Sequence, residues 1–181
     1  MAVRFGSMAV ETVVGDIAAQ PDCDAVVNAA NAELMPGGGV AGAIHRAAGP
    51  GLAEACRPLA PIAPGEAVIT DAFELPNDYI IHCLGPVYGR DEPAAELLAG
   101  CYRQVLELAD AYGIDAVAAP AISTGAFGFP MEEAARVACT TLRDEASRHE
   151  RPQRWRWVLP GEDAQRAHER ILEQIVEGGR A

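Results

Sequence analysis

Three short stretches of this sequence combine glycine with polar side chains, and each follows an apolar run. They read GDI at residues 15–17, NAANAELMPGGGV at residues 28–40 and ISTGAFGFP at residues 122–130. Glycine lets a backbone N–H approach a ligand closely, so such loops can bind phosphate without a positive side chain. The Asn28 and Asn31 amides can exchange hydrogen bonds with a sugar hydroxyl or a water, and Asp16 can accept one from an adenine amino group. Together the stretches suggest a nucleotide site.

The glycine triplet has an alternative interpretation. Residues 37–42 satisfy G-x-G-x-x-G, but a dinucleotide fingerprint begins immediately after a strand. The residues AANAELMP intervene here, which speaks against a nicotinamide-dependent dehydrogenase. A second phosphate-binding loop is the better interpretation, and two such loops at one sheet edge suggest a nucleotide diphosphate.

Each candidate also has a purely structural interpretation. Asn28 and Asn31 could stabilise turns, and Asp16 could cap a helix over the following residues IAAQ. The third stretch could be a turn and a helix cap, since Pro130 suits the start of a helix. Their expected placement at one edge of a sheet favours a binding site over separate turns.

Several residues of chemical interest are assigned to packing. His82 lies inside an apolar run and is expected to be a buried histidine whose hydrogen bonds are satisfied. Trp155 and Trp157 alternate on the last predicted strand, so packing in the core or at its rim is expected. His45 lies on a helix behind the glycine triplet, where packing or capping is a better interpretation than proton transfer.

The composition excludes several classes of function. A net charge of −12 over 181 residues argues against binding nucleic acid or an acidic membrane, which both need a basic face. The chain has no lysine, so it has neither a Walker A phosphate lysine nor a Schiff base. Five scattered cysteines without a C-x-x-C pair predict neither disulfides nor a zinc site. Free thiols, and the lack of a spanning run or signal pattern, predict a cytoplasmic protein.

Apolar runs bounded by turn residues predict strands, and amphipathic patterns between them predict helices. Alternating strands and helices predict one α/β domain over residues 1–181, with a largely parallel sheet covered on both faces. A few residues before Met8 are expected to precede the fold. The predicted strands are residues 8–14, 25–28, 67–70, 79–84, 116–120 and 155–159, and the main predicted helices are residues 93–113, 130–150 and 163–176.

With these motifs the sequence resembles the macro domain family, in particular its MacroD-type branch. GDI, VVNAAN, GGGV-GAIHRAAGP and ISTGAFGFP occur in the family's order and spacing, over about residues 8–175. The resemblance implies a three-layer α/β/α fold around a six-stranded mixed sheet, with a site for ADP-ribose. No cofactor is expected, and no metal site is expected because no cluster of Asp, Glu, His or Cys has ligand spacing.

The resemblance also assigns roles to the residues of the site. Asp16 and Ile17 would bind adenine, Asn31 would bind the distal ribose, and Phe127 would lie against that ribose. Asn31 and Gly38 are the candidate catalytic residues. The residues implied to line the diphosphate and distal ribose are Gly37, Gly38, Gly39, Val40, Ser123, Thr124, Gly125, Ala126 and Phe127.

MacroD-type members hydrolyse the ester between ADP-ribose and acidic side chains, and they deacetylate O-acetyl-ADP-ribose. The sequence departs from the family where Ala41 replaces the usual aspartate, Pro36 precedes the glycine triplet, and Pro160 replaces an aromatic residue beside adenine. Two hypotheses therefore remain. One is a hydrolase acting on mono-ADP-ribosylated proteins through a positioned, phosphate-assisted water; the other is a non-catalytic reader of ADP-ribose.

Overall fold

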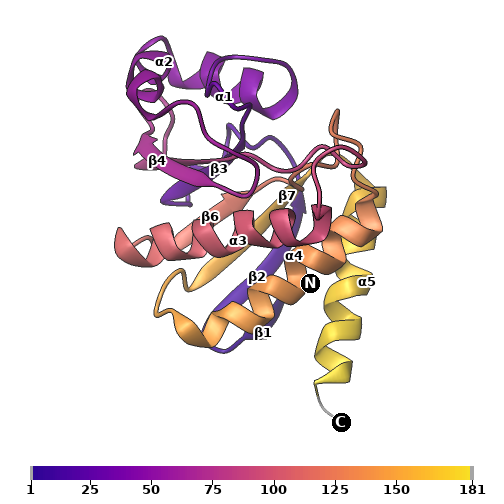
Figure 1. The fold of residues 1–181 in the computed structure, drawn as a ribbon. Helices are drawn as coiled ribbons and strands as arrows, with labels where there is room; N and C mark the ends of the chain where they lie inside the picture. The colour runs from indigo at the N-terminus through magenta and orange to yellow at the C-terminus, as the bar shows by residue number, and fades with distance from the viewer. Residues whose placement is uncertain (1, 180–181) are drawn as a thin grey trace.

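The computed structural model describes residues 2–179, and their strands form one seven-stranded mixed sheet in the order β1-β2-β7-β6-β3-β5-β4 (Figure 1). The five strands from β2 to β5 in this order pair in parallel, while β1 and β4 are antiparallel strands at the two edges. The strands are β1 Ala2–Phe5, β2 Met8–Val14, β3 Ala25–Ala29, β4 Ala67–Asp71, β5 Tyr79–Cys83, β6 Ala116–Ala119 and β7 Arg154–Leu159.

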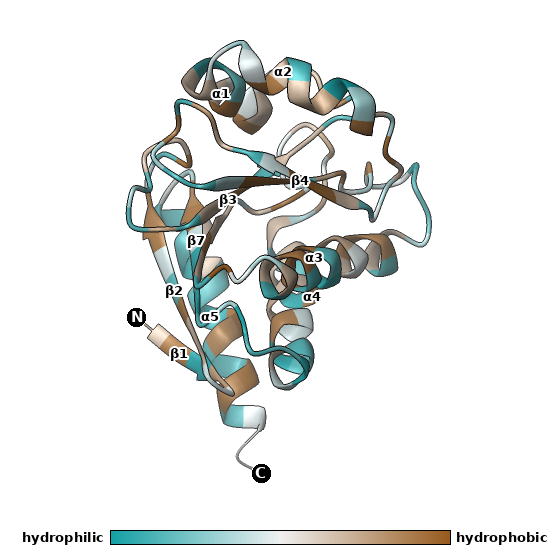
Figure 2. Cartoon of the chain, turned by 90° about the vertical axis from the view of Figure 1, so that its left-hand side faces the viewer, coloured by the Kyte–Doolittle hydropathy of each residue, from teal (hydrophilic) through white to brown (hydrophobic). Residues whose placement is uncertain are grey.

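Helices cover both faces of this sheet, which confirms the three-layer α/β/α prediction. In Figure 2, α1 and α2 lie above the sheet while α3 and α4 lie below it. Helix α5 packs beside α4 on the lower face (Figure 1). The helices are α1 Gly39–Ala48, α2 Gly51–Cys56, α3 Ala94–Ala111, α4 Met131–Glu145 and α5 Glu162–Gly178, with short 3-10 turns at Arg57–Leu59 and Ala146–Arg148.

The central strands are apolar on both sides because each side faces a core. On β6, Val117 and Ala119 pack into the core beneath α3, α4 and α5, while Ala116 and Ala118 pack beneath α1. This is the period of two that a strand requires, and burial of both faces is typical of parallel sheets. The pattern explains why β6 reads as a continuous apolar run in the sequence.

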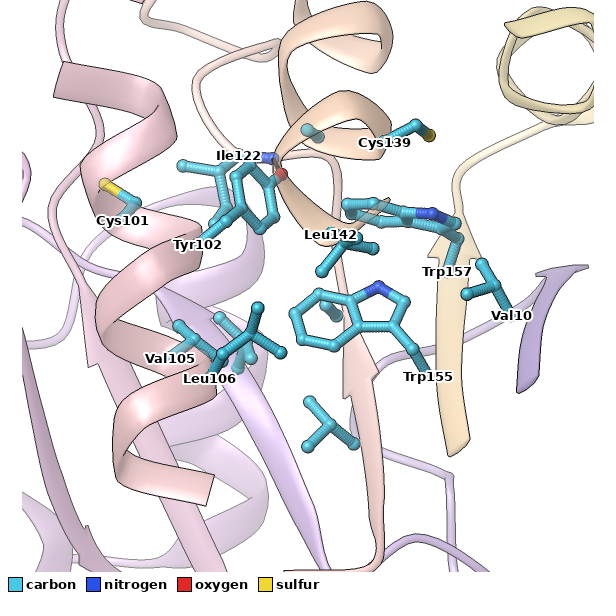
Figure 3. Close-up of a cluster of buried hydrophobic side chains, with 14 of the residues drawn as sticks. Val10, Cys101, Tyr102, Val105, Leu106, Ile122, Cys139, Leu142, Trp155 and Trp157 are labelled. Carbon is cyan, nitrogen blue, oxygen red and sulfur yellow. Dashed lines mark hydrogen bonds between the residues drawn. The ribbon is translucent and has the colours of Figure 1, made fainter. Parts of the chain in front are cut away.

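Two tryptophans on β7 anchor the lower core. Trp155 and Trp157 are fully buried, as expected, with ring centroids 5.4 Å apart (Figure 3). The Tyr102 ring of α3 lies 5.4 Å from Trp157, and its hydroxyl accepts a hydrogen bond from the Ile122 N–H at 3.3 Å. The aromatic core therefore holds the backbone of Ile122, the first residue of the ISTGAFGFP stretch.

The N-terminal residues correct one expectation. Residues before Met8 were expected to precede the fold, but Ala2–Phe5 pairs with β2 as a seventh strand, in place of the six that the resemblance implied. Phe5 is opposite Met8, and Gly6 between them has a φ of 60°. A two-residue Gly-Ser connection is a recognised hairpin signal, so the sequence contained the information. The short helix α2 was also not predicted.

Among the residues that the structure describes, no helix is both long enough and apolar enough to cross a bilayer.

His82 is buried with its ring nitrogens satisfied, as the sequence predicted. The Asn28 Nδ2 lies 3.0 Å from its Nδ1, and the Thr70 Oγ1 lies 2.9 Å from its Nε2. Since Asn28 can only donate through Nδ2, the neutral tautomer with a proton on Nε2 fits both bonds. Burial, and then the nearby His45, lower the pKa of His82 to about 3.

We expect this histidine to make folding sensitive to moderate acid. Its folded pKa lies below the unfolded value of about 6.5, so its contribution to stability is present above pH ~6.5 and is lost as pH falls towards 3. One such histidine adds at most about 1.4 kcal/mol per pH unit to the slope of the free energy of unfolding. Urea unfolding between pH 7 and pH 4.5 should show a smaller slope for His82→Gln than for wild type, and equal slopes would contradict this account.

Candidate functional site

A cavity of about 790 Å³ lies at the edge of the sheet where the parallel strands end. The loops that follow β2, β3, β5, β6 and β7 all reach it, together with the first turn of α1. This is the edge at which open α/β sheets bind ligands. The lining residues are Gly15, Asp16, Ile17, Ala29, Ala30, Asn31, Gly37, Gly38, Gly39, Val40, Ala41, Ala43, Gly85, Pro120, Ala121, Ile122, Ser123, Thr124, Gly125, Ala126, Phe127, Val158, Leu159 and Pro160.

The first turn of α1 presents unpaired backbone donors to this cavity. Gly38 is the N-cap residue and makes no side-chain cap. Helix geometry leaves the N–H groups of the first turn without intrahelical acceptors, and within residues 2–179 those of Gly39, Val40 and Ala41 have no other acceptor. Unpaired donors and the positive end of the helix dipole together favour an anion.

The loop before α1 folds back over its own helix. A Cβ at Gly42 would collide with the Gly37 carbonyl oxygen and would lie 3.0 Å from the Arg46 Nη1. The absence of a side chain at Gly42 therefore allows the glycine triplet to lie against α1. At Gly38, by contrast, a Cβ would meet nothing within 4 Å.

Asn31 holds the stretch of chain that leads into the glycine triplet. Its Nδ2 donates to the Met35 carbonyl at 2.7 Å, and its Oδ1 accepts from the Met35 N–H at 3.0 Å. Between them, Leu34 has a φ of 57° and is buried. Met35 uses only one of the two hydrogens on the Asn31 Nδ2. Gly37 lies close to the same nitrogen, since a Cβ built on Gly37 would be only 3.4 Å from the Asn31 Nδ2.

The loop after β6 is held open by the loop after β5. Ser123 has a φ of 68°, and its hydroxyl donates to the Pro86 carbonyl at 2.8 Å. A Cβ at Gly85 would collide with Ser123, so only glycine fits there. The Tyr88 N–H donates to the Phe127 carbonyl at 2.8 Å.

This arrangement turns a second set of backbone donors towards the cavity. In the described part of the chain, the N–H groups of Gly125, Ala126 and Phe127 have no acceptor, although all three residues line the cavity. A non-glycine residue in the left-handed region costs about 1–3 kcal/mol, and such strain occurs most often at functional sites. Ser123 is therefore a feature of the site as well as of the loop.

Asp16 occupies the other end of the cavity. Its Oδ1 accepts from the Ala18 N–H at 2.9 Å, which makes a turn rather than the helix cap considered from the sequence, since no helix follows. The carboxylate is exposed and keeps Oδ2 for another donor. Ile17 beside it is buried against the upper core.

The cavity wall contains very little charge. Asp16 is the only titratable side chain among the lining residues, and the lining contains no arginine. Ala41, where the resemblance led us to expect an aspartate, is 5 % exposed and lines the cavity, as does Pro160. No group of three or more His, Cys, Asp or Glu side chains in residues 2–179 could hold a metal ion.

The structure brings together every predicted site residue except one. The Asn28 side chain points into the upper layer, where it bonds to His82, and it does not line the cavity. His45 is buried in the same layer. Reasoning from residue types selected three loops. It missed Gly85 after β5, and Pro160 after β7 entered only through the resemblance, which puts this position beside adenine. Both positions come at the ends of predicted strands, and this placement could have indicated them from the sequence.

Gly42 and Gly38 should respond differently to alanine. Alanine at an exposed helix position gains about 1 kcal/mol over glycine, but at Gly42 the clash with a backbone oxygen outweighs this gain. We expect Gly42→Ala to lower the free energy of unfolding by about 1–3 kcal/mol in urea titrations. Gly38→Ala should leave it unchanged to within about 0.5 kcal/mol. A Gly42→Ala protein as stable as wild type would contradict the close approach of Gly37.

Comparison with known proteins identifies the fold and its family. The profile of the Macro domain family matches residues 27–138. An O-acetyl-ADP-ribose deacetylase of Cronobacter sakazakii is 44 % identical over 173 residues, which cover 93 % of this chain and 96 % of that protein. A Macro domain-containing protein of Methanosarcina mazei is 48 % identical over 154 residues, covering 84 % and 82 % of the two chains.

Solved structures agree with these relatives. The Oceanobacillus iheyensis macrodomain with ADP has a TM-score of 0.93 and 36 % identity, covering 98 % of this chain and 97 % of that one. The Trypanosoma brucei macrodomain in complex with ADP-ribose has a TM-score of 0.84 and 33 % identity, covering 90 % and 68 %. The family that the motifs suggested is confirmed: this chain belongs to the macro domain family and is of MacroD type.

Proposed function

We propose that this chain binds ADP-ribose and hydrolyses the ester bond that links ADP-ribose to an acidic side chain or to acetate. One observation carries the proposal. The cavity has a carboxylate turn at one end and two sets of unpaired backbone N–H groups further along, so it complements a base joined to a diphosphate. A volume of about 790 Å³ suits a ligand of this size.

In this proposal each part of ADP-ribose has its own subsite. Adenine lies against the Asp16–Ile17 turn, with its amino group donating to Asp16. The diphosphate lies between the first turn of α1 and the loop after β6. The distal ribose lies between Asn31 and Phe127. Ligands in related proteins support binding of this nucleotide, since the Trypanosoma brucei structure contains ADP-ribose and the Oceanobacillus iheyensis structure contains ADP.

Catalysis in this site would depend on positioning. The free hydrogen of the Asn31 amide and the glycine triplet would hold a water beside the ester. In a glycosyl ester the water attacks the anomeric carbon of the distal ribose, the bond from that carbon to the carboxyl oxygen breaks, and the acidic side chain leaves as a carboxylate while the proton of the water passes to a diphosphate oxygen. In an acetyl ester the water attacks the acetyl carbon, its proton passes by way of the diphosphate oxygen to the departing ribose oxygen, and acetate is released. A general base is typically worth about 10²–10⁴-fold, so orientation and preorganised backbone dipoles would carry the rate without the family's aspartate.

The relatives support a hydrolase, and the bond in question favours it. The Cronobacter sakazakii protein and two similar relatives are named O-acetyl-ADP-ribose deacetylase. A glycosyl ester has a carboxylate leaving group at the anomeric carbon, whereas an arginine-linked ADP-ribose would have to expel a much poorer one. Mono-ADP-ribosylated proteins with ester linkages are therefore the proposed substrates, in preference to arginine-linked ones.

A second candidate function is a reader that binds ADP-ribose without turnover. Ala41 favours it, because this buried wall position carries no base and the only titratable group in the lining is Asp16 at the opposite end. The two functions share the binding site and differ only in the rate of the chemical step.

We expect calorimetry to give a micromolar Kd for ADP-ribose, equivalent to about −8 kcal/mol. ADP should bind more weakly because it makes no distal-ribose contacts. Asp16→Ala should weaken ADP-ribose binding by about 1–3 kcal/mol if the carboxylate accepts a shielded hydrogen bond. Equal affinities for ADP and ADP-ribose would refute the assignment of the distal-ribose subsite.

Turnover should separate the two candidate functions. We expect wild type to release ADP-ribose from an ester-linked, mono-ADP-ribosylated protein at a rate unaffected by EDTA. Asn31→Ala should lower kcat more than it weakens binding, because its contact with the water is made in the transition state. If wild type binds ADP-ribose but releases none, while Ala41→Asp alone gives hydrolysis, the chain is a reader.

A further inference from the structure

The Asp16–Ile17 turn belongs to the loop between β2 and β3, and a buried side chain holds it in place. The Asp16 carbonyl accepts from the Ala19 N–H at 3.0 Å and from the Gln20 Nε2 at 2.9 Å. The first bond is local to the turn. The second ties the turn to a side chain that is only 8 % exposed, so the backbone of Asp16 cannot move without breaking a shielded hydrogen bond.

Gln20 is fixed in turn by two residues from other parts of the chain. The Arg156 Nη1 donates to the Gln20 Oε1 at 2.9 Å. The Asn77 Nδ2 donates to the Gln20 carbonyl at 2.8 Å. Because the amide nitrogen must donate to Asp16 and the amide oxygen must accept from Arg156, the side chain has one orientation that satisfies both.

Arg156 connects this amide to the sheet. It lies on β7 opposite Glu11 of β2, and its Nε donates to the Glu11 Oε1 at 2.9 Å. Its two terminal nitrogens each donate to one Asp22 carboxylate oxygen at 2.7 Å. The Arg156 side chain is 13 % exposed, and Val158, two residues further along the strand and on the same face, lines the cavity.

The ion pair between Arg156 and Asp22 stays charged at neutral pH. The hydrogen bonds from Arg156 lower the pKa of the Asp22 carboxyl to about 2. A guanidinium can serve several acceptors at once in a planar fork, whereas an ammonium offers a point charge. The arrangement is therefore a rigid connection from β7, through Arg156 and Gln20, to the backbone of Asp16.

We propose that Gln20 and Arg156 are positioning residues for the base subsite, and that they set the preference of this site for adenine. The inference rests on the proposed function, because it takes Asp16 as the acceptor for the adenine amino group. Neither residue lines the cavity. Their effect would be to hold the carboxylate and the Ile17 N–H at the separation that an adenine edge requires.

The test compares two ligands that differ only at the base. ADP-ribose carries the adenine amino group, while inosine diphosphate ribose carries a carbonyl there and cannot donate to Asp16. Inosine also carries a hydrogen on N1, where adenine has an acceptor that can face the Ile17 N–H. Calorimetry on wild type should therefore show at least about a tenfold preference for ADP-ribose, the usual worth of one such hydrogen bond. The variants are Gln20→Glu and Arg156→Lys, and thermal unfolding checks that each is folded.

Gln20→Glu keeps an acceptor for Arg156 but removes the donor to the Asp16 carbonyl. The variant therefore tests the hydrogen bond between residue 20 and Asp16 separately from the bond to Arg156. We expect the preference to fall to about twofold in this variant and in Arg156→Lys, with the Kd for inosine diphosphate ribose changing less than the Kd for ADP-ribose. The matched control is Arg154→Gln. Arg154 lies on the same strand and also pairs with Asp22, but it makes no bond to Gln20, so the preference should stay at the wild-type value.

The possible failures are distinguishable. A wild type that does not bind ADP-ribose refutes the proposed function and the positioning role together. A wild type that binds both ligands equally refutes the role of Asp16. If wild type prefers adenine and Gln20→Glu keeps that preference, the positioning role is wrong while the proposed function stands. Equal weakening of both ligands by Gln20→Glu would assign Gln20 to general support of the cavity and would also overturn the positioning role.

Discussion

The parallel pairing of five consecutive strands in the sheet is the constraint on which the rest of this structure depends. Strands β2, β7, β6, β3 and β5 all end at one edge, so the five loops that follow them converge on one cavity. The antiparallel strands β1 and β4 close the sheet at its two sides. A slip of one residue in any of these pairings would exchange the two faces of a strand. On β7 it would turn Trp155 and Trp157 out of their core and move Val158 away from the cavity wall.

Convergence alone does not make an anion site, because this cavity wall carries one carboxylate and no cation. Attraction for a diphosphate must come from backbone N–H groups, and these are useful only where the loops are held open. Three polar side chains do this by bonding to main chain: Asn31 to Met35, Ser123 to Pro86, and Gln20 to Asp16. These polar side chains thus fix the backbone geometry, and in the proposed complex the main chain contacts the ligand. This division would allow an acidic, lysine-free protein to hold a doubly charged group.

The sequence predicted those parts of the fold that depend on local patterns. The six strand runs from residues 8 to 159 are confirmed with shifts of one residue at some ends, because each is apolar and bounded by turn residues. The hairpin at Ala2–Phe5 was missed because its strand is short and carries Arg4. The direction of the Asn28 side chain depends on cross-strand register with His82, and the bond between Gln20 and Arg156 joins residues 136 apart in the chain. Such long-range pairings leave no local signal, so sequence reasoning could place loops at an edge but could not say which side chains meet the ligand and which support the loop.

In the proposed complex, main-chain N–H groups of two loops bind the diphosphate. A titration with ADP-ribose, followed by two-dimensional amide correlation NMR of the ¹⁵N-labelled protein, tests it most directly. A hydrogen bond to a phosphate oxygen shifts an amide proton downfield, and the account predicts such shifts at both loops and nowhere on the far side of the sheet. The amides expected to shift are Gly39, Val40, Ala41, Gly125, Ala126 and Phe127. Saturable binding that leaves these six unchanged while shifting the amides around exposed arginines would contradict it.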